Sequence, residues 1–337
     1  MNSNQYKVLV LTDHTKHSGE NSLYDLMRKM IVHDKTASID IASRANVVND
    51  NFFNNQQGNT LMVHQVKNNF GFNPDKNPLS TDLISSNLAD YDLVWLRMPP
   101  PLSKDFLDFI SKVFTNATII NNPDAIYKTG SKEFLTNFAE VCPPLQVCKS
   151  LDDIIAFKKS FPIVLKPFRD YGGRGLVRID GDQVWEGNDK RSFTDFSEDY
   201  KANPVPYLGV SFLKNVGLGD KRIVVVNGQV MGASLRLPPK DSWICNVAMG
   251  GTSNVAEVDD AEKEIVALID PVLANMGIVM YGIDTLVDDD GKRVLSEINT
   301  TSIGGLPQIA ATRNERLVEQ AIDLIWSFYE DNKIKNT

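Results

Sequence analysis

A hairpin near the C-terminus constrains this chain more than any other stretch of its sequence. Residues 281–299 read YGIDTLVDDDGKRVLSEIN, in which two β-rich segments flank Asp290-Gly291, a pair typical of hairpin turns. A turn centred on this pair places Asp284 directly opposite Glu297, and Asn299 shares a face with Glu297 because strand side chains alternate. Facing carboxylates destabilise a ladder. The hairpin therefore predicts a cation between them.

Composition excludes several classes of protein. The chain has 337 residues, 42% of them hydrophobic, enough for a substantial core in two or three lobes, and its net charge of −8 argues against a nucleic-acid partner. No apolar run reaches the roughly 18 residues that span a bilayer. The first residues read as a strand and not as a signal peptide, and three cysteines lack disulfide or metal-ligand spacing. We expect a cytoplasmic protein without a membrane partner.

Strands and helices alternate up to about residue 150, which predicts a mainly parallel α/β layer. Beyond that point, short hydrophobic strands joined by Gly-rich or charged turns predict an antiparallel sheet in an α+β unit. Ser22 is the expected N-cap of the first helix, and residues 313–330 are expected to form the last one. The Asn-rich residues 44–80 predict exposed strands and loops.

A Gly-rich turn follows a lysine in IVLKPFRDYGGRGLVRI. Lys166 lies on a strand, and the backbone N–H groups of Gly172 and Gly173 could approach phosphate oxygens while the lysine supplies a charge. On spacing alone a tight hairpin is the more frequent meaning of such a turn. The segment matches neither GxxxxGK[ST] nor the dinucleotide fingerprint.

Two arginines flank a second hairpin, KRIVVVNGQVMGASLRLP. A turn at Asn227-Gly228 would pair Arg222 with residue 233 and leave Arg236 beyond the end of the ladder. Arginine binds carboxylate or phosphate in a bidentate manner, although solvated arginines at a sheet edge are an equal alternative. The Gly-rich residues 243–254 fit either a lid over a site or an ordinary surface loop.

The order of these pieces resembles the ATP-grasp ligases, and most closely the bacterial-type glutathione synthetases. The likeness covers about residues 88–330 and the first strand and helix, and it includes VWLRMPPPLSKDFLDFI and INNPDAIYKTGSKEFLTNF. It implies an α/β N-terminal domain over residues 1–126, on the substrate side. An α+β ATP-grasp domain with antiparallel sheets follows over 127–337, with a lid subdomain at about 150–213.

The resemblance also implies a site. It assigns the metal, Mg²⁺ with Mn²⁺ as a possible substitute, to Asp284, Glu297 and Asn299. It assigns ATP to Lys132, Lys166, Gly172, Gly173, Asp220 and the hinge residues Val210 and Leu213. It assigns the acyl phosphate and the acceptor to Arg222, Arg236 and Asn246.

We therefore predict an ATP-dependent carboxylate–amine ligase that forms an amide through an acyl phosphate, with γ-glutamylcysteine and glycine as expected substrates. Ile244, Thr252 and Pro307 stand where the family carries arginines, so Arg174, Arg236 and Arg313 are the candidates to replace them. A ligase for another acid and amine, and a non-catalytic ATP-binding regulatory protein, are the alternatives. We also expect a homo-oligomer.

Overall fold

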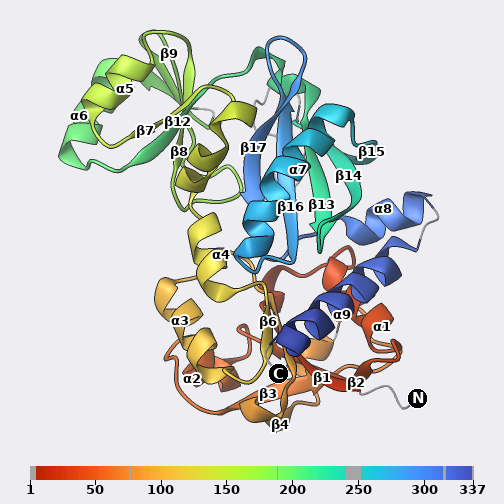
Figure 1. Cartoon of the computed structure of the whole chain (residues 1–337). Helices are drawn as coiled ribbons and strands as arrows, with labels where there is room; N and C mark the ends of the chain where they lie inside the picture. The colour runs from red at the N-terminus through yellow and green to blue at the C-terminus, as the bar shows by residue number, and fades with distance from the viewer. Residues whose placement is uncertain (1–4, 76, 188, 240–251, 314–315, 336–337) are drawn as a thin grey trace.

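Three β-sheets organise the molecule (Figure 1). The computed structural model describes residues 5–75, 77–187, 189–239, 252–313 and 316–335. The N-terminal layer lies at the bottom of Figure 1, and the second and third sheets lie above it, side by side. Within the described ranges, no helix is long and apolar enough to cross a bilayer.

The N-terminal sheet has six strands in the order β4-β3-β2-β1-β5-β6. Strands β2, β1, β5 and β6 are parallel to one another, and β3 and β4 join antiparallel at one edge. The predicted parallel α/β layer is thus confirmed, with an antiparallel edge added. Its elements are β1 (Tyr6–Thr12), α1 (Ser22–Met30), β2 (Thr36–Ser43), α2 (Asp50–Phe53), β3 (Thr60–Gln65), β4 (Ile84–Asn87), β5 (Leu93–Arg97), α3 (Lys104–Val113), β6 (Thr118–Ile120) and α4 (Pro123–Thr129).

The rest of the chain forms two antiparallel sheets, which confirms the α+β domain with antiparallel sheets that the resemblance implied. The second sheet, in the order β11-β10-β9-β8-β12-β7, contains β7 (Leu145–Cys148), β8 (Ile163–Pro167), β9 (Val177–Asp180), β10 (Gln183–Glu186), β11 (Asp189–Ser192) and β12 (Tyr207–Ser211), with helices α5 (Leu151–Phe157) and α6 (Phe193–Ala202). The third, in the order β15-β14-β13-β16-β17, contains β13 (Asp220–Val226), β14 (Gln229–Leu237), β15 (Thr252–Ala256), β16 (Met280–Val287) and β17 (Arg293–Asn299). Helices α7 (Asp260–Asn275), α8 (Leu306–Arg313) and α9 (Leu317–Lys335) accompany the third sheet, and the 3₁₀ helix Lys132–Val141 precedes the second.

Strand β13 shows how the third sheet divides its two faces. Ile223 and Val225 pack in the core that contains α7, because alternate side chains of a strand face the same side. Val224 and Val226 face the other way and pack with residues of α8 and α9. Further along that same face, residues 220 and 222 are polar. One end of this face is therefore closed by helices, and the other end is left for a site.

The C-terminal helix α9 ties the third sheet to the N-terminal layer. It lies beside α1 (Figure 1), and Trp326 is fully buried with its ring centroid 5.8 Å from that of Tyr6. The sequence predicted one helix over 313–330. In the structure, α8 ends at Arg313 and α9 begins at Leu317.

Two other local predictions were wrong. Asn21, and not Ser22, caps α1, because the Asn21 side chain accepts a hydrogen bond from the Leu23 N–H. Residues 44–80 are not only exposed strands and loops, since Phe52 and Phe53 of α2 are buried against the helical side of the N-terminal layer.

The β13–β14 hairpin differs from its predicted register. A β-bulge leaves Met231 as an extra residue between Val230 and Gly232, which shifts every pair beyond it by one position. Arg222 therefore pairs with Ser234 and not with residue 233. Arg236 pairs with Asp220 inside the ladder instead of projecting past its end.

The approach of β13 to β14 yields a prediction for Gly219. Its φ is +85°, and a Cβ there would lie 2.5 Å from the Arg236 carbonyl oxygen. Gly291 has a similar φ of +86° with no atom within 4 Å of such a Cβ. We expect Gly219→Ala to lower the free energy of unfolding by about 1–3 kcal/mol more than Gly291→Ala, because only the first adds overpacking to backbone strain. Urea denaturation of both variants measures this, and equal losses would contradict it.

Candidate active site

The β16–β17 hairpin places Asp284 opposite Glu297, as the sequence predicted, but by a different route. The turn is one residue longer than expected, with the Asp288 N–H bonded to the Lys292 carbonyl at 2.8 Å. A bulge at Ser296 then shifts the register back by one residue. The two offsets cancel, so the facing carboxylates arise from a turn and a bulge together.

Asp284 is the centre of the charged cluster on this face. Arg222 binds it in a bidentate manner at 2.8 and 2.7 Å, and the Arg236 guanidinium lies 2.9 Å from its Oδ2. The Asn299 amide donates to the same oxygen at 3.2 Å. Burial alone would raise the pKa of Asp284, but the two guanidiniums hold that pKa well below its usual range. Asp284 is therefore an anion at neutral pH.

Arg236 is shared between two carboxylates. Its Nε donates to Asp220 Oδ1 at 2.8 Å, and its Nη2 contacts both Asp220 and Asp284. Burial and the neighbouring Asp284 charge raise the pKa of Asp220 to about 6, although Arg236 opposes this. The Arg236 side chain is thus 15% exposed and is bound to two carboxylates.

Two lysines approach Glu297 from elements outside the third sheet. The Lys132 ammonium, at the start of the 3₁₀ helix, pairs with the Glu297 carboxylate. Lys166, on β8, donates to the carbonyl and the hydroxyl of Ser296 at 3.3 and 3.2 Å. Burial, and next the Lys132 charge, lower the pKa of Lys166. For Lys132, burial acts in the same direction, but the Glu297 carboxylate outweighs it and raises the pKa.

A cavity of about 430 Å³ joins these groups, with walls from the second sheet, the third sheet and the loop after β17. Every residue that the sequence assigned to the site lines it, except Asn246, which lies outside the described residues together with Ile244. Gly172 and Gly173 have φ values of +71° and +79°, which explains why glycines occupy this turn.

Among the lining residues that sequence reasoning missed, Tyr171 and Ser296 contact the two lysines. The Tyr171 ring lies 5.6 Å from the Lys132 ammonium, and its hydroxyl donates to the Gly130 carbonyl at 2.8 Å. Its position in DYGG, directly before the glycine pair, was a usable signal. Ser296 lies at the bulge of β17 and accepts a hydrogen bond from Lys166, and no pattern in the sequence predicted that bulge.

The charges of this cluster favour an anionic ligand. Lys132, Lys166, Arg222 and Arg236 supply four positive charges, and Asp220, Asp284 and Glu297 supply three negative ones, which leaves one excess positive charge (4 − 3 = +1). A polyphosphate suits such a cavity. Arg174 also lines it and is exposed, whereas Arg313 binds Glu257 and the Ala256 carbonyl and is not part of the lining.

The donor set also fits a hard divalent cation. Asp284 and Glu297 offer carboxylate oxygens and Asn299 an amide oxygen, which are the ligands that Mg²⁺ takes. In the described part of the chain, no group of three or more His, Cys, Asp or Glu side chains could hold a metal. Among the described residues, Asp284, Glu297 and Asn299 are therefore the best candidate for a metal site. The two carboxylates now bind Arg222 and Lys132.

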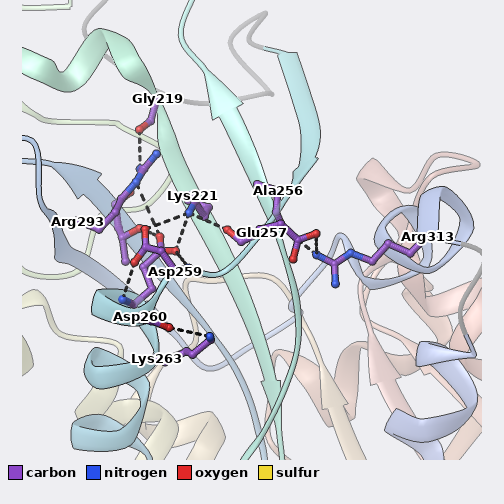
Figure 2. Close-up of polar contacts among 11 residues, drawn as sticks. Gly219, Lys221, Ala256, Glu257, Asp259, Asp260, Lys263, Arg293 and Arg313 are labelled. Atoms are coloured by element: carbon purple, nitrogen blue, oxygen red, sulfur yellow. Dashed lines mark hydrogen bonds and ion pairs between the residues drawn. The ribbon is translucent and has the colours of Figure 1, made fainter.

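A second charged cluster surrounds Lys221 (Figure 2). Because side chains of a strand alternate, Lys221 faces the side of the third sheet opposite to that of Arg222. Lys221 donates to the fully buried Glu262 of α7 at 2.6 Å and to the Glu257 carbonyl at 2.8 Å. The Thr285 hydroxyl donates to Glu262 at 2.7 Å, and the Arg293 Nε lies 3.9 Å from it. One carboxylate thus connects β13, β16 and β17 directly behind the site.

Comparison with known proteins agrees with this geometry. The family model described as prokaryotic glutathione synthetase, ATP-grasp domain, matches residues 131–314. A glutathione synthetase from Bradyrhizobium diazoefficiens is 30% identical over 252 residues, covering 74% of this chain and 76% of its own. One from Prochlorococcus marinus (strain MIT 9313) is 31% identical, covering 70% and 74%.

Solved structures share the fold over nearly the whole chain. The D-cycloserine synthetase DcsG superposes with a TM-score of 0.66 at 12% identity, covering 96% of this chain and 99% of its own. A D-alanine–D-alanine ligase from Bacillus anthracis, complexed with ATP, has a TM-score of 0.57 at 13% identity, covering 98% and 100%.

The fold and the cavity define an ATP-grasp ligase, a class of enzyme that uses ATP and a divalent metal ion. The chain belongs to the prokaryotic glutathione synthetase family. It is an ATP-dependent ligase that acts on small molecules.

The buried cluster yields a prediction about stability. Lys221→Met leaves Glu262 as a poorly compensated buried charge and should lower the free energy of unfolding by about 3–5 kcal/mol. Adding Glu262→Gln to that variant removes the unpaired charge and should recover part of the loss. Chemical denaturation measures both, with Lys263→Met as the control, because its pair with Asp260 is exposed to solvent and contributes little to stability. A double variant less stable than Lys221→Met would contradict this account.

Proposed function

We propose that this chain is a glutathione synthetase, which joins the cysteinyl carboxylate of γ-glutamylcysteine to the amine of glycine with ATP. The observation that supports this most is the facing pair Asp284 and Glu297 in one cavity with two lysines and two arginines. The γ-phosphoryl group of ATP passes to the substrate carboxylate, which releases ADP and gives an acyl phosphate. The amine nitrogen then attacks the acyl carbon, and phosphate leaves.

We propose that Lys132 and Lys166 hold the ATP phosphates, with the backbone N–H groups of Gly172 and Gly173 above them. Phosphoryl transfer depends mainly on positioning and charge neutralisation, which these groups provide. Arg222 and Arg236 lie on the same face and stabilise the charge on the transferred group. Asn246 is proposed to contact the acceptor; it is not among the residues that the structure describes.

We assign the metal to Asp284, Glu297 and Asn299, as Mg²⁺ with Mn²⁺ as a possible substitute. When bound, such an ion neutralises phosphate oxygens and orients them for in-line transfer. To hold it, Asp284 and Glu297 would give up part of their contacts with Arg222 and Lys132, which could then contact phosphate.

We assign the adenine to the end of β12 and the residues that follow it. Val210 and Leu213 are 7% and 8% exposed and line the apolar part of the cavity. Asp220 is proposed to lie on the nucleotide side. The domains are proposed at residues 1–126 and 127–337, with a lid subdomain at about 150–213.

A substrate panel tests the activity. We expect γ-glutamylcysteine plus glycine to release ADP well above the rate with ATP alone, and omission of glycine to abolish amide formation. Ile244, Thr252 and Pro307 replace arginines of the family, which supports a second candidate, a ligase for another acid and amine. ADP release at the background rate with this pair, beside rapid release with another, would favour that candidate. ATP binding without turnover of any pair would favour a regulatory protein.

The metal assignment predicts the effect of Glu297→Gln. This change removes one of two anionic ligands, so ligation should fall by at least about 100-fold, because even residues behind a metal ligand usually contribute roughly 10–100-fold. The thermal unfolding curve should stay close to that of the wild type, because glutamine keeps the shape of the Glu297 side chain, which is 30% exposed. Glu257→Gln is the control, because the Glu257 side chain is 89% exposed and does not line the cavity. Normal ADP release by Glu297→Gln at saturating Mg²⁺ would reject the assignment.

A further inference from the structure

Arg97 is a buried cation at the boundary between the N-terminal layer and the third sheet. It is the last residue of β5 and is 3% exposed. Within the described ranges, no carboxylate pairs with it and its Nε has no hydrogen-bond partner. Burial lowers the pKa of Arg97 to about 10, so the guanidinium remains charged at neutral pH. A buried charge without a counter-ion is costly, and a bound anion nearby would offset that cost.

The guanidinium of Arg97 holds the loop that follows β17. Its Nη2 donates to the Ile303 carbonyl at 2.8 Å, and the Ser22 hydroxyl donates to the same oxygen at 3.2 Å. Three residues earlier, the side-chain amide of the buried Asn121 donates to the Thr300 carbonyl at 2.7 Å. The N-terminal layer therefore fixes two carbonyl groups of this loop.

Fixing those carbonyls also fixes the direction of two N–H groups. In a trans peptide the C=O and the following N–H point in opposite directions, so the N–H groups of Thr301 and Gly304 point away from the N-terminal layer. In the described part of the chain, no backbone N–H of residues 301–305 donates to a protein acceptor. Successive free N–H groups of this kind form an anion-binding concavity.

The loop lies at the edge of the cavity beside Arg222. Residues Thr300, Thr301 and Ser302 line the cavity, and a Cβ at Gly305 would lie 3.9 Å from the Ser234 hydroxyl. A Cβ at Gly282 would lie 3.4 Å from Ile303 Cγ2 and 3.5 Å from Arg222 Cδ, so both side chains cross β16 at the same point. An anion on this loop would be next to the guanidinium that is proposed to bind the acyl phosphate.

We propose that the loop Thr301–Gly305 is a cradle for the non-reacting carboxylate of a substrate, with Arg97 as the positioning residue behind it. This inference rests on the proposed function. Backbone N–H groups and a buried guanidinium then take the role of the arginine that the family carries where this chain has Pro307. The carboxylate belongs either to the amine substrate, glycine, or to the α-carboxylate of the acid substrate.

Gly304 offers a matched pair of variants. Gly304→Pro removes one proposed donor, whereas Gly304→Ala keeps the N–H, and no atom lies within 4 Å of the added Cβ. Arg97→Met removes the buried charge, Arg97→Lys restores it with a different geometry, and Arg28→Met is an exposed control.

The kinetic test compares each substrate with an analogue that lacks the carboxylate. Glycine is compared with glycinamide, and γ-glutamylcysteine with 4-aminobutanoylcysteine. For one of these pairs, we expect Gly304→Pro and Arg97→Met to raise KM for the carboxylate form roughly tenfold or more, since one charge-assisted bond contributes about that factor. KM for the analogue and for ATP should change less than about twofold. The pair that responds identifies which substrate the loop binds.

A purely structural role gives a different pattern. Equal increases for the carboxylate and its analogue in both pairs, or no change in Gly304→Pro relative to Gly304→Ala, would overturn the proposal. Arg97→Lys should recover part of the loss if the charge matters.

A measurement without turnover separates this inference from the proposed function. Acetate added to ¹⁵N-labelled enzyme with a non-hydrolysable ATP analogue should shift the amide resonances of Thr301 and Gly304, and acetamide should not. Unchanged resonances would reject the cradle even if the enzyme makes glutathione. Acetate-specific shifts in an enzyme that does not join γ-glutamylcysteine to glycine would reject only the proposed substrates.

Discussion

Two carboxylates that face each other across neighbouring strands repel each other, and this repulsion must be offset wherever the chain folds. Here Asp284 and Glu297 lie opposite each other on β16 and β17, with cations around them from β13, β14 and the 3₁₀ helix Lys132–Val141. Each of these elements has one of its two ends at the cavity. The facing pair therefore sets the place where the second sheet, the third sheet and the loop after β17 meet.

The third sheet can hold this pair because one of its faces lines the cavity and the other connects the strands to α7. On β13, Arg222 points to the cavity and Lys221 to the opposite face, as strand alternation requires. Lys221 joins the buried Glu262, which also accepts from Thr285, the neighbour of Asp284. The strands that carry the polar face are thus also connected on their opposite face, by the ion pair between Lys221 and Glu262. The Lys221–Glu262 pair holds the strands in place on one face of the third sheet. The ion pairs of Asp284 on the other face can then change partners without moving the strands.

The sequence correctly predicted which side chains of the β16–β17 hairpin face the cavity. It did not predict the register of either hairpin. Strand alternation and a turn dipeptide brought Asp284 opposite Glu297 correctly, although the longer turn and the bulge at Ser296 were not expected. The same reasoning failed at the other hairpin, because the bulge at Met231 had no second offset to cancel it. A bulge depends on packing across the sheet and leaves no periodic signal in the sequence. The turn residues therefore predict the strand register only as far as the first bulge. Gly232, with φ of +137° and a Cβ position 2.8 Å from Ile309, is the sort of packing constraint that decides it.

The proposed nucleotide half and the proposed substrate half of the cavity differ in how much of each can be predicted from the sequence. Lysines, glycine turns and carboxylates act through their own side chains, so their spacing in the chain is readable. The loop Thr301–Gly305 offers backbone groups, and its orientation depends on Arg97 and Asn121, which are about 200 residues away in the sequence and carry no motif of their own. Replacement of a family arginine by Pro307 reads as a loss when only side chains are counted. In the proposed cradle, peptide N–H groups and the buried charge of Arg97 replace that arginine, because a carboxylate requires hydrogen-bond donors and positive potential and not a particular residue type.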